Sequence, residues 1–282
     1  MKYIDLHVHS NISDGTLSPT EVVNLAAESG LIAIALTDHD TIDGVKEAKE
    51  QAKQLMKTGV EITVIPGTEL SASYLNRDIH ILGLFVDIEN TSFRKALENA
   101  CKERDLRNIK MCENLNKVGI PITVEAMKLD NPNTIITRAH FAKYLYENGY
   151  VKSREEAFQK YLHEHGPYYV PRQYLTPEEA ISYIKEAGGI PVLAHPLLYK
   201  FSHTQLVTLI QQLKKAGLVG IEAIYSCNIS NDESYVKSLA REYDLVITGG
   251  SDFHGANKPH IQIGKGKGNL RIPESILSSL RR

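Results

Sequence analysis

The sequence predicts an α/β fold in which helices cover a largely parallel β-sheet. Short and almost wholly apolar segments alternate with amphipathic segments over the first 90 residues, with a period of about thirty residues, and the alternation returns near the C-terminus. Strands that are apolar on both faces are typical of parallel strands buried between helices. This periodicity is compatible with both an open sheet and a closed barrel.

The N-terminal part is predicted to contain four strands and two helices. The first helix begins after Ser18, because Ser18 and Glu21 have the spacing of a capping box and Pro19 occupies the first helical position. Gly30 ends this helix. The strands are expected at residues 3–9, 31–37, 61–66 and 79–86, and the helices at residues 18–29 and 43–57.

Residues 92–171 interrupt the alternation. They contain charge-rich helical segments at 93–117, 137–148 and 153–165, and no convincing strand. We therefore expect a helical insertion over the carboxyl ends of the strands, because α/β folds place insertions and sites there. The charged run from Lys102 to Lys110 is interpreted as an exposed, nearly balanced helix face that could help to hold an RNA backbone.

The alternation returns after the insertion. A second capping box with proline at the first helical position, Thr176-Pro177-Glu178-Glu179, begins a helix. Three more strands are expected at residues 190–194, 221–225 and 245–248, with helices near residues 204–216 and 231–243. Residues 1–91 and 172–282 would thus form one domain of seven strands, into which residues 92–171 are inserted.

The composition excludes several classes of protein. The 282 residues, 42% of them hydrophobic, are enough to bury a full core, and no apolar run approaches the roughly 18–20 residues that a membrane helix needs. Asp5 lies where a secretory signal would be apolar, so a cytoplasmic location is expected. A net charge of −2 lacks the basic excess of proteins that grip long nucleic acids, which leaves small or short anionic substrates. No obligatory protein partner is indicated.

Histidines and carboxylates gather where the predicted strands end. His7 and His9 lie two residues apart in the first strand and share one face, at a spacing that suits two ligands of one metal ion. Such a pair in isolation is more often structural. Nearly all of the remaining strands also carry a ligand-type residue, however, and active sites of this architecture assemble at the carboxyl ends of strands. The candidate metal ligands are His7, His9, Asp14, His39, Glu69, His80, His195, Asp252 and His254.

These ligands are too many for one ion of four to six ligands, so two or three divalent ions are predicted. The three cysteines lack CxxC spacing, so zinc, manganese or iron is favoured over a structural thiolate site. Ions about 3.5–4 Å apart ionise a bridging water and clamp the oxygens of a phosphoryl group, so we expect hydrolysis by attack of a metal-bound hydroxide. Glu69 is the candidate bridge, because a carboxylate has two oxygens to share.

Six short motifs contain most of these ligands. They are His7-Val8-His9, Ser10 to Gly15, Thr37-Asp38-His39-Asp40, Pro66-Gly67-Thr68-Glu69, Ala194-His195-Pro196 and Gly250-Ser251-Asp252-Phe253-His254. Together they resemble the motifs of the polymerase and histidinol phosphatase (PHP) family. The resemblance implies a distorted seven-stranded (β/α)7 barrel with a helical insertion and a trinuclear centre. It implies that His7, His9, Glu69 and Asp252 hold one ion, that Asp14, His39 and His254 hold a second, and that Glu69, His80 and His195 hold a third.

The insertion contains the segment Ile136-Thr137-Arg138-Ala139-His140. This segment is similar to the Thr-Arg-x-His element of the bacterial PHP subgroup that acts on nucleoside 3′,5′-bisphosphates and, in some members, on short RNA as a 5′-to-3′ exoribonuclease. The resemblance implies that Arg138 and His140 contact substrate. A planar guanidinium binds phosphate oxygens in a bidentate way, which suits this role, and Arg172 is a further candidate for it.

We therefore expect a metal-dependent phosphoesterase that hydrolyses the 3′-phosphate of nucleoside 3′,5′-bisphosphates, short 5′-phosphorylated RNA, or both. His254, His195 and Asp252 are the candidate catalytic residues, and the sequence does not show which group is the general acid. A phosphatase of the histidinol-phosphate type is an alternative, although Asp14 stands where that branch tends to have histidine. An amidohydrolase, which usually adds a carboxylated lysine, and an inactive metal-binding module are the remaining alternatives.

Overall fold

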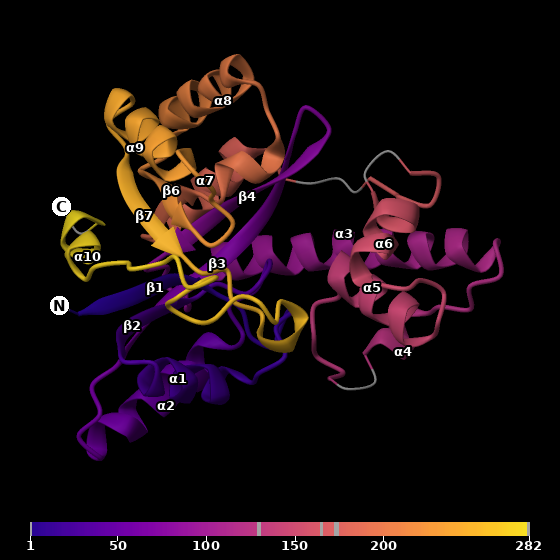
Figure 1. The fold of residues 1–282 in the computed structure, drawn as a ribbon, viewed down its shortest axis with the longest axis horizontal. Helices are drawn as coiled ribbons and strands as arrows, with labels where there is room; N and C mark the ends of the chain where they lie inside the picture. Colours follow the sequence, from indigo (N-terminus) through magenta and orange to yellow (C-terminus); the bar gives the residue numbers. More distant parts are fainter. Residues whose placement is uncertain (1, 129–130, 164–165, 172–174, 281–282) are drawn as a thin grey trace.

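The computed structural model describes residues 2–128, 131–163, 166–171 and 175–280. Within them, seven strands form one sheet in chain order: β1 (Tyr3–Val8), β2 (Leu31–Leu36), β3 (Thr63–Tyr74), β4 (Arg77–Leu84), β5 (Ile190–Leu193), β6 (Gly220–Tyr225) and β7 (Val246–Gly250). A bridge between Val8 and Phe253 joins the two edges, and the His9 N–H donates to the Phe253 carbonyl at 3.0 Å. The sheet is a nearly closed barrel, which confirms the expected fold (Figure 1).

Helices cover the outside of this barrel. They are α1 (Pro19–Glu28), α2 (Val45–Lys57), α7 (Pro177–Glu186), α8 (His203–Ala216), α9 (Asp232–Glu242) and the short α10 (Ser275–Leu280). α1 and α2 lie against β2 and β3, whereas α7, α8 and α9 cover the opposite side (Figure 1). The predicted capping box is present, because the Ser18 side chain accepts a hydrogen bond from the Glu21 N–H. In the described part of the chain, none of the helices combines the length and apolar character needed to cross a membrane.

β4 runs antiparallel to both of its neighbours, so the sheet is mixed rather than parallel throughout. Leu75 and Asn76 join β3 to β4, and their φ values of 50° and 58° suit a tight two-residue hairpin turn. Pairing with β4 also continues β3 to Tyr74, whereas we predicted its end near residue 66. Glu69 therefore lies inside a strand and not after one.

The insertion forms a second body beside the barrel. α3 (Thr91–Asn116) runs from the barrel into it, and the second half of α3 is surrounded by α4 (Val124–Met127), α5 (Arg138–Glu147) and α6 (Arg154–Ala157) (Figure 1). The helix predicted at 153–165 is shorter than expected, since α6 continues as a π-helical turn, η1 (Phe158–Leu162), that ends at Leu162. A separate apolar cluster that includes Met111, Phe141 and Leu145 forms the core of this body. The limits at residues 92 and 171 stay predictions.

Candidate metal centre

His7 and His9 lie at the carboxyl end of β1, with their Nε2 atoms 3.1 Å apart. Both side chains are fully buried. A divalent ion placed beside two such nitrogens could bind the lone pair of each. The pair therefore has the arrangement that the sequence predicts for two ligands of one ion.

Glu69 lies at the centre of the predicted ligands, and its carboxylate contacts five imidazoles. Oε2 lies 3.2–3.3 Å from nitrogens of His7, His9 and His39, and Oε1 lies 2.7–2.9 Å from nitrogens of His80 and His195. The two oxygens thus face two different sets of imidazoles. This is the geometry that a carboxylate bridge between two ions requires.

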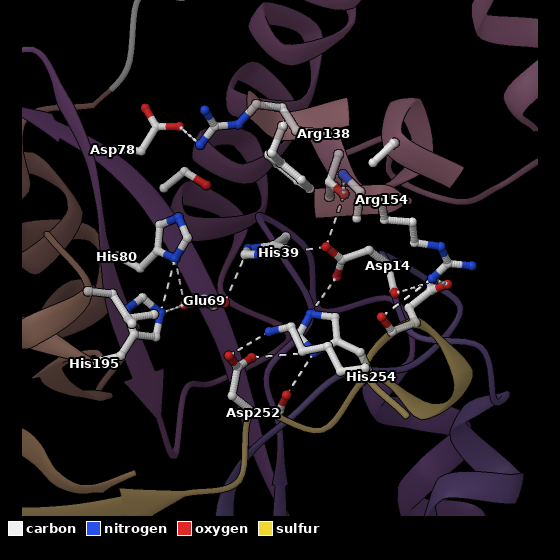
Figure 2. Close-up of a pocket in the computed structure, with 18 of the residues that line it drawn as sticks. Asp14, His39, Glu69, Asp78, His80, Arg138, Arg154, His195, Asp252 and His254 are labelled. Carbon is white, nitrogen blue, oxygen red and sulfur yellow. Dashed lines mark hydrogen bonds and ion pairs between the residues drawn. The ribbon is translucent and has the colours of Figure 1, made fainter. Parts of the chain in front are cut away.

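Asp14 and Asp252 complete the cluster on the other side. Asp14 Oδ1 lies 3.1 Å from His254 Nε2, and its Oδ2 lies 3.6 Å from His39 Nε2. Asp252 Oδ1 lies 3.4 Å from His254 Nδ1 and 3.5 Å from His9 Nε2. All of the predicted ligands are therefore brought together at one end of the barrel, and Figure 2 labels those that line the cavity above them.

The ligand atoms divide into three overlapping groups, in each of which they lie within 4.8 Å of one another. The groups are His9, Asp14, His39 and His254; His7, His9 and Glu69; and His39, Glu69 and His80. The sets implied by the resemblance lie close together as well, because His195 Nε2 lies 2.9 Å from Glu69 Oε1 and 3.3 Å from His80 Nδ1. Asp252 Oδ1 likewise lies 3.7 Å from His7 Nε2 and 3.5 Å from His9 Nε2, so which residues share an ion stays a prediction. A donor set of imidazole nitrogens and carboxylate oxygens suits divalent ions such as zinc, manganese and iron. The residues present therefore fit divalent metal ions.

The pKa values of this cluster are shifted in different directions by burial and by neighbouring charges. Burial alone would raise the pKa of Glu69, but His80, His7 and His39 hold it well below its ordinary value. Burial likewise opposes ionisation of Asp14, and His254 and His39 outweigh it, so the pKa of Asp14 is also well below its usual range. Burial lowers the pKa of His39 to about 3, which keeps this imidazole neutral. Burial lowers the pKa of His7 and of His80 as well, but Glu222 and Glu69 outweigh it at His7 and Glu69 outweighs it at His80, so both pKa values are raised. Deprotonated carboxylates and neutral imidazoles are the forms that bind metal ions, so metal binding would release protons from these two histidines.

Glu222, which the sequence analysis did not single out, orients two of the ligands. Its buried Oε1 lies 3.0 Å from His7 Nδ1, and its Oε2 accepts the His195 N–H at 2.8 Å. The contact with Nδ1 leaves Nε2 of His7 directed at Glu69. A charged residue inside the otherwise apolar strand β6 was the signal that could have revealed it.

Asp252 is held from the side opposite the histidines. Its Oδ2 accepts hydrogen bonds from the Tyr225 hydroxyl at 2.7 Å and from Lys258 Nζ at 2.6 Å. Burial would raise the pKa of Asp252, but Lys258 and His254 keep it well below its ordinary value. Oδ1 is therefore left as a charged oxygen that faces His9 and His254.

A cavity of about 450 Å³ opens over these ligands, between the barrel and the insertion (Figure 2). Asp14, His39, Glu69 and the other ligands drawn in Figure 2 line it. Basic side chains also line it, namely Arg104, Arg107, Arg138, Arg154 and Lys258. All four arginines come from the insertion, so the barrel provides the metal ligands and the insertion provides most of the positive charge.

The three predicted substrate-binding residues have different placements. Arg138 begins α5 and lines the cavity, where its Nη2 donates to Asp78 Oδ2 at 3.0 Å (Figure 2). His140 is not among the described residues that line the cavity, and its Nδ1 accepts the Thr137 N–H at 3.0 Å as part of a helix cap. Arg172 lies outside the described residues. Substrate contact by these residues stays a prediction.

Arg104 and Arg107 correct the interpretation of the first insertion helix. We predicted an exposed face between Lys102 and Lys110, but Arg104 and Arg107 are only 5% and 3% exposed. Arg104 forms a buried ion pair with Asp40, at the end of β2. The two arginines lie three residues apart on the face of α3 that packs toward the barrel, whereas Lys102 and Lys110 lie on the exposed face.

Comparisons with proteins of known sequence agree with this geometry. Residues 5–168 match the family model described as the PHP domain. The chain is 36% identical over 273 residues to the 5′-3′ exoribonuclease Rnm of Salmonella typhimurium, an alignment that covers 96% of this chain and 90% of that protein. It is 35% identical over 266 residues to the 3′,5′-nucleoside bisphosphate phosphatase of Chromobacterium violaceum, an alignment that covers 94% of this chain and 91% of that protein.

Two solved structures share the whole architecture, insertion included. One, from Bifidobacterium adolescentis, is provisionally assigned as a metal-dependent phosphoesterase; it has a TM-score of 0.85 and 29% identity, with 99% of this chain and 95% of that chain covered. The other, from Chromobacterium violaceum, is described as an amidohydrolase with bound sulfate and no metal. Its TM-score is 0.88 and its sequence identity is 33%, and the alignment covers 99% of this chain and 96% of that chain.

Proposed function

Because the chain belongs to the PHP family of metal-dependent phosphoesterases, we propose that it hydrolyses a phosphate ester on a ribose that carries a second phosphate. The proposed substrates are nucleoside 3′,5′-bisphosphates, which would lose their 3′-phosphate, and short 5′-phosphorylated RNA, which would release nucleotides from its 5′ end. In both substrates the bond between phosphorus and the 3′-oxygen would break. One site could therefore serve both.

The observation that supports this proposal is the division of the cavity into a ligand-lined part and a basic part. The scissile phosphate would bind at the ligands, where metal ions can contact its oxygens. The second phosphate, at the 5′ position, would bind to basic side chains of the insertion, of which Arg138 is the main candidate. Two relatives over nearly the same length are named for substrates or reactions of this kind.

The residues of the chain have separate roles in the proposed reaction. The ligands grouped around Glu69 would hold two or three ions of manganese, zinc or iron. When bound, these ions supply an ionised water and compensate the charge of the phosphate. Asp252, with its Oδ1 facing the histidines, would act as a ligand, and Lys258 would add positive charge beside it. The leaving 3′-oxygen would take its proton from His195 or His254, whichever of the two does not hold an ion, since both line the cavity.

A comparison of substrates tests the proposal. Phosphate release, with manganese present, would be measured from adenosine 3′,5′-bisphosphate, adenosine 3′-monophosphate and histidinol phosphate, beside mononucleotide release from a 5′-phosphorylated RNA oligomer. We expect the bisphosphate or the RNA to give the highest kcat/KM. A preference for histidinol phosphate would contradict the proposed substrates, although the assignment of the metal centre would still hold.

The R138Q variant tests the anchor for the second phosphate. We expect kcat/KM to fall about 10- to 100-fold for substrates with a 5′-phosphate, because a charged hydrogen bond contributes about 1.5–3 kcal/mol, and to change little for adenosine 3′-monophosphate. R241Q, at an exposed arginine of α9, is the matched control. Equal losses on both kinds of substrate would refute the role of Arg138.

A further inference from the structure

The cavity also contains two exposed apolar side chains that neither metal binding nor phosphate binding explains. Phe158 is 38% exposed and Leu198 is 49% exposed, and both line the cavity. A single exposed apolar residue is ordinary on a protein surface. Here, however, two of them share a cavity that is otherwise lined mainly by ligands and basic groups. Other large exposed apolar residues in the described part of the chain, such as Ile229, lie outside it.

Leu198 is held rigidly on the barrel side. It belongs to the 3-10 helix η2 (Pro196–Tyr199), and its N–H donates to the carbonyl of His195 at 3.0 Å. The next residue, Tyr199, is buried, and its hydroxyl donates to the Ala194 carbonyl at 2.7 Å and accepts the His80 N–H at 2.9 Å. Burial of Tyr199 fixes η2 beside two predicted ligands. Leu198 therefore presents its side chain to the cavity from a fixed position.

Phe158 is presented from the insertion side. Ala157 and Leu162, its neighbours in α6 and η1, are fully buried in the core of the insertion, so Phe158 lies on a different face of the helix. That face also carries Arg154, four residues earlier, which lines the cavity and donates to Asn257 Oδ1 of the barrel at 2.8 Å. An aromatic ring thus stands one helical turn from an arginine.

We propose that Phe158 and Leu198 form an apolar subsite that receives the nucleobase of a nucleotide substrate, an inference that rests on the proposed function. A nucleobase is planar and apolar on both faces, and an aromatic ring binds such a face by stacking without regard to base identity. The subsite would hold the base while the ligands and the basic side chains hold the two phosphates. A cavity of about 450 Å³ lies within the range of roughly 300–1,000 Å³ that is usual for small ligands.

The test compares paired substrates in paired variants. One substrate is adenosine 3′,5′-bisphosphate, and the other is the same ribose bisphosphate with hydrogen in place of the base; if only RNA is turned over, the 5′-terminal base is removed instead. The readout is the ratio of kcat/KM for the substrate with the base to that without it. We expect F158A to lower this ratio about tenfold and L198A to lower it by a smaller factor. F158W, which keeps an aromatic face, should restore it.

I229A, at an exposed apolar residue outside the cavity, is the matched control and should leave the ratio unchanged. Phe158 and Leu198 are partly exposed, so their variants should fold, and circular dichroism would verify this. A wild-type ratio in F158A and L198A would overturn the base subsite while leaving the proposed function standing. A wild-type enzyme that turns over neither the bisphosphate nor the RNA would overturn the proposed function and this inference with it.

Discussion

The barrel holds its candidate ligands on strands and strand ends that brace one another, whereas the insertion is a separate helical body that docks on the barrel beside the same cavity. In the barrel, Ser10 and Ser13 each donate to the Asp38 carboxylate at 2.6 Å, so the loops after β1 and β2 hold each other in place. From the insertion, Thr137 donates to Asp14 at 3.0 Å and Arg154 to Asn257 at 2.8 Å. Metal binding and substrate selection should therefore respond differently to mutation.

The largest effect is expected at the centre of the barrel. E69Q should lower kcat by about a thousandfold or more and reduce the bound metal, because it replaces one carboxylate oxygen with an NH2 group, which cannot bind an ion, and removes the negative charge at the centre of the cluster. Activity assays and elemental analysis of the purified protein would measure both. E61Q, at an exposed glutamate, should behave as the wild type. An E69Q protein with full metal content would contradict the assigned position of the ions.

The ion pair between Arg104 and Asp40 joins the two regions, and breaking it should have the next largest effect. R104Q removes the guanidinium charge that faces the buried Asp40 carboxylate, so we expect the free energy of unfolding to fall by about 3 kcal/mol in urea titrations. K102Q, on the exposed face of the same helix, should change it by less than about 0.5 kcal/mol. If the D40N/R104Q double variant costs as much as R104Q, the pair is not the cause.

His140 gives the insertion a pH dependence of its own. Burial lowers the pKa of His140 from its ordinary value of 6.5 to about 4, because the opposing effect of Asp14 is outweighed by burial together with Lys143 and Arg104. The unfolded chain therefore binds this proton first, and stability should fall as the pH falls from about 6.5 to 4, by about 1–2 kcal/mol at pH 5. H140N, which keeps an acceptor for the Thr137 N–H, should lose this part of the slope.

Stability curves at pH 7 and pH 5 would measure the slope. The matched control is H260N, at an exposed histidine in a loop, which should keep the slope of the wild type. Other buried histidines titrate as well, so the difference between H140N and the wild type is the quantity to compare. Identical slopes in the two proteins would show that His140 does not make this contribution.

The smallest effect is expected where a barrel residue acts through a ligand. E222Q removes the charge beside His7 Nδ1 and should weaken metal binding about tenfold, as measured by competition with a chelator. Because Glu222 would position His7 and not contact substrate, saturating metal should restore most of the kcat. If saturating metal does not restore kcat, Glu222 takes part in the reaction itself and does not act only by positioning His7.

The barrel side of the site was largely readable from the sequence, because strand alternation and the position of strand ends determine where a side chain points. The side chains of His7 and His9 lie next to each other, as their spacing predicts. Glu69 also lies among the predicted ligands. The sequence analysis did not predict, however, that β3 continues past Glu69 in an antiparallel pair with β4. No local signal marks a long-range strand pairing, and the short turn at Leu75 and Asn76 became informative only once both strands were seen together.

The insertion side was less readable. A helix carries its charges on all faces, and only contact with another body decides which of them are buried. Arg104 and Arg107 look like solvated residues in the sequence, and the packing of α3 on the barrel makes them part of a cavity wall. The outward position of Phe158 likewise follows from packing, because the core of the insertion takes up Ala157 and Leu162 and leaves Phe158 partly exposed.

The contact between β1 and β7 has a consequence for how the molecule folds. The Ser251 N–H donates to Asp5 at 2.8 Å across 246 residues of chain, and His7 and Asp252 are neighbours only when this contact has formed. Contacts between such distant segments form late, because the loop between them must first be ordered. Glu69 and His80, in contrast, lie on one hairpin and can meet early. We therefore expect part of the ion-binding site to form before β1 and β7 close the barrel. Metal uptake during refolding should then be biphasic, and the rate of its slow phase should report the rate of barrel closure.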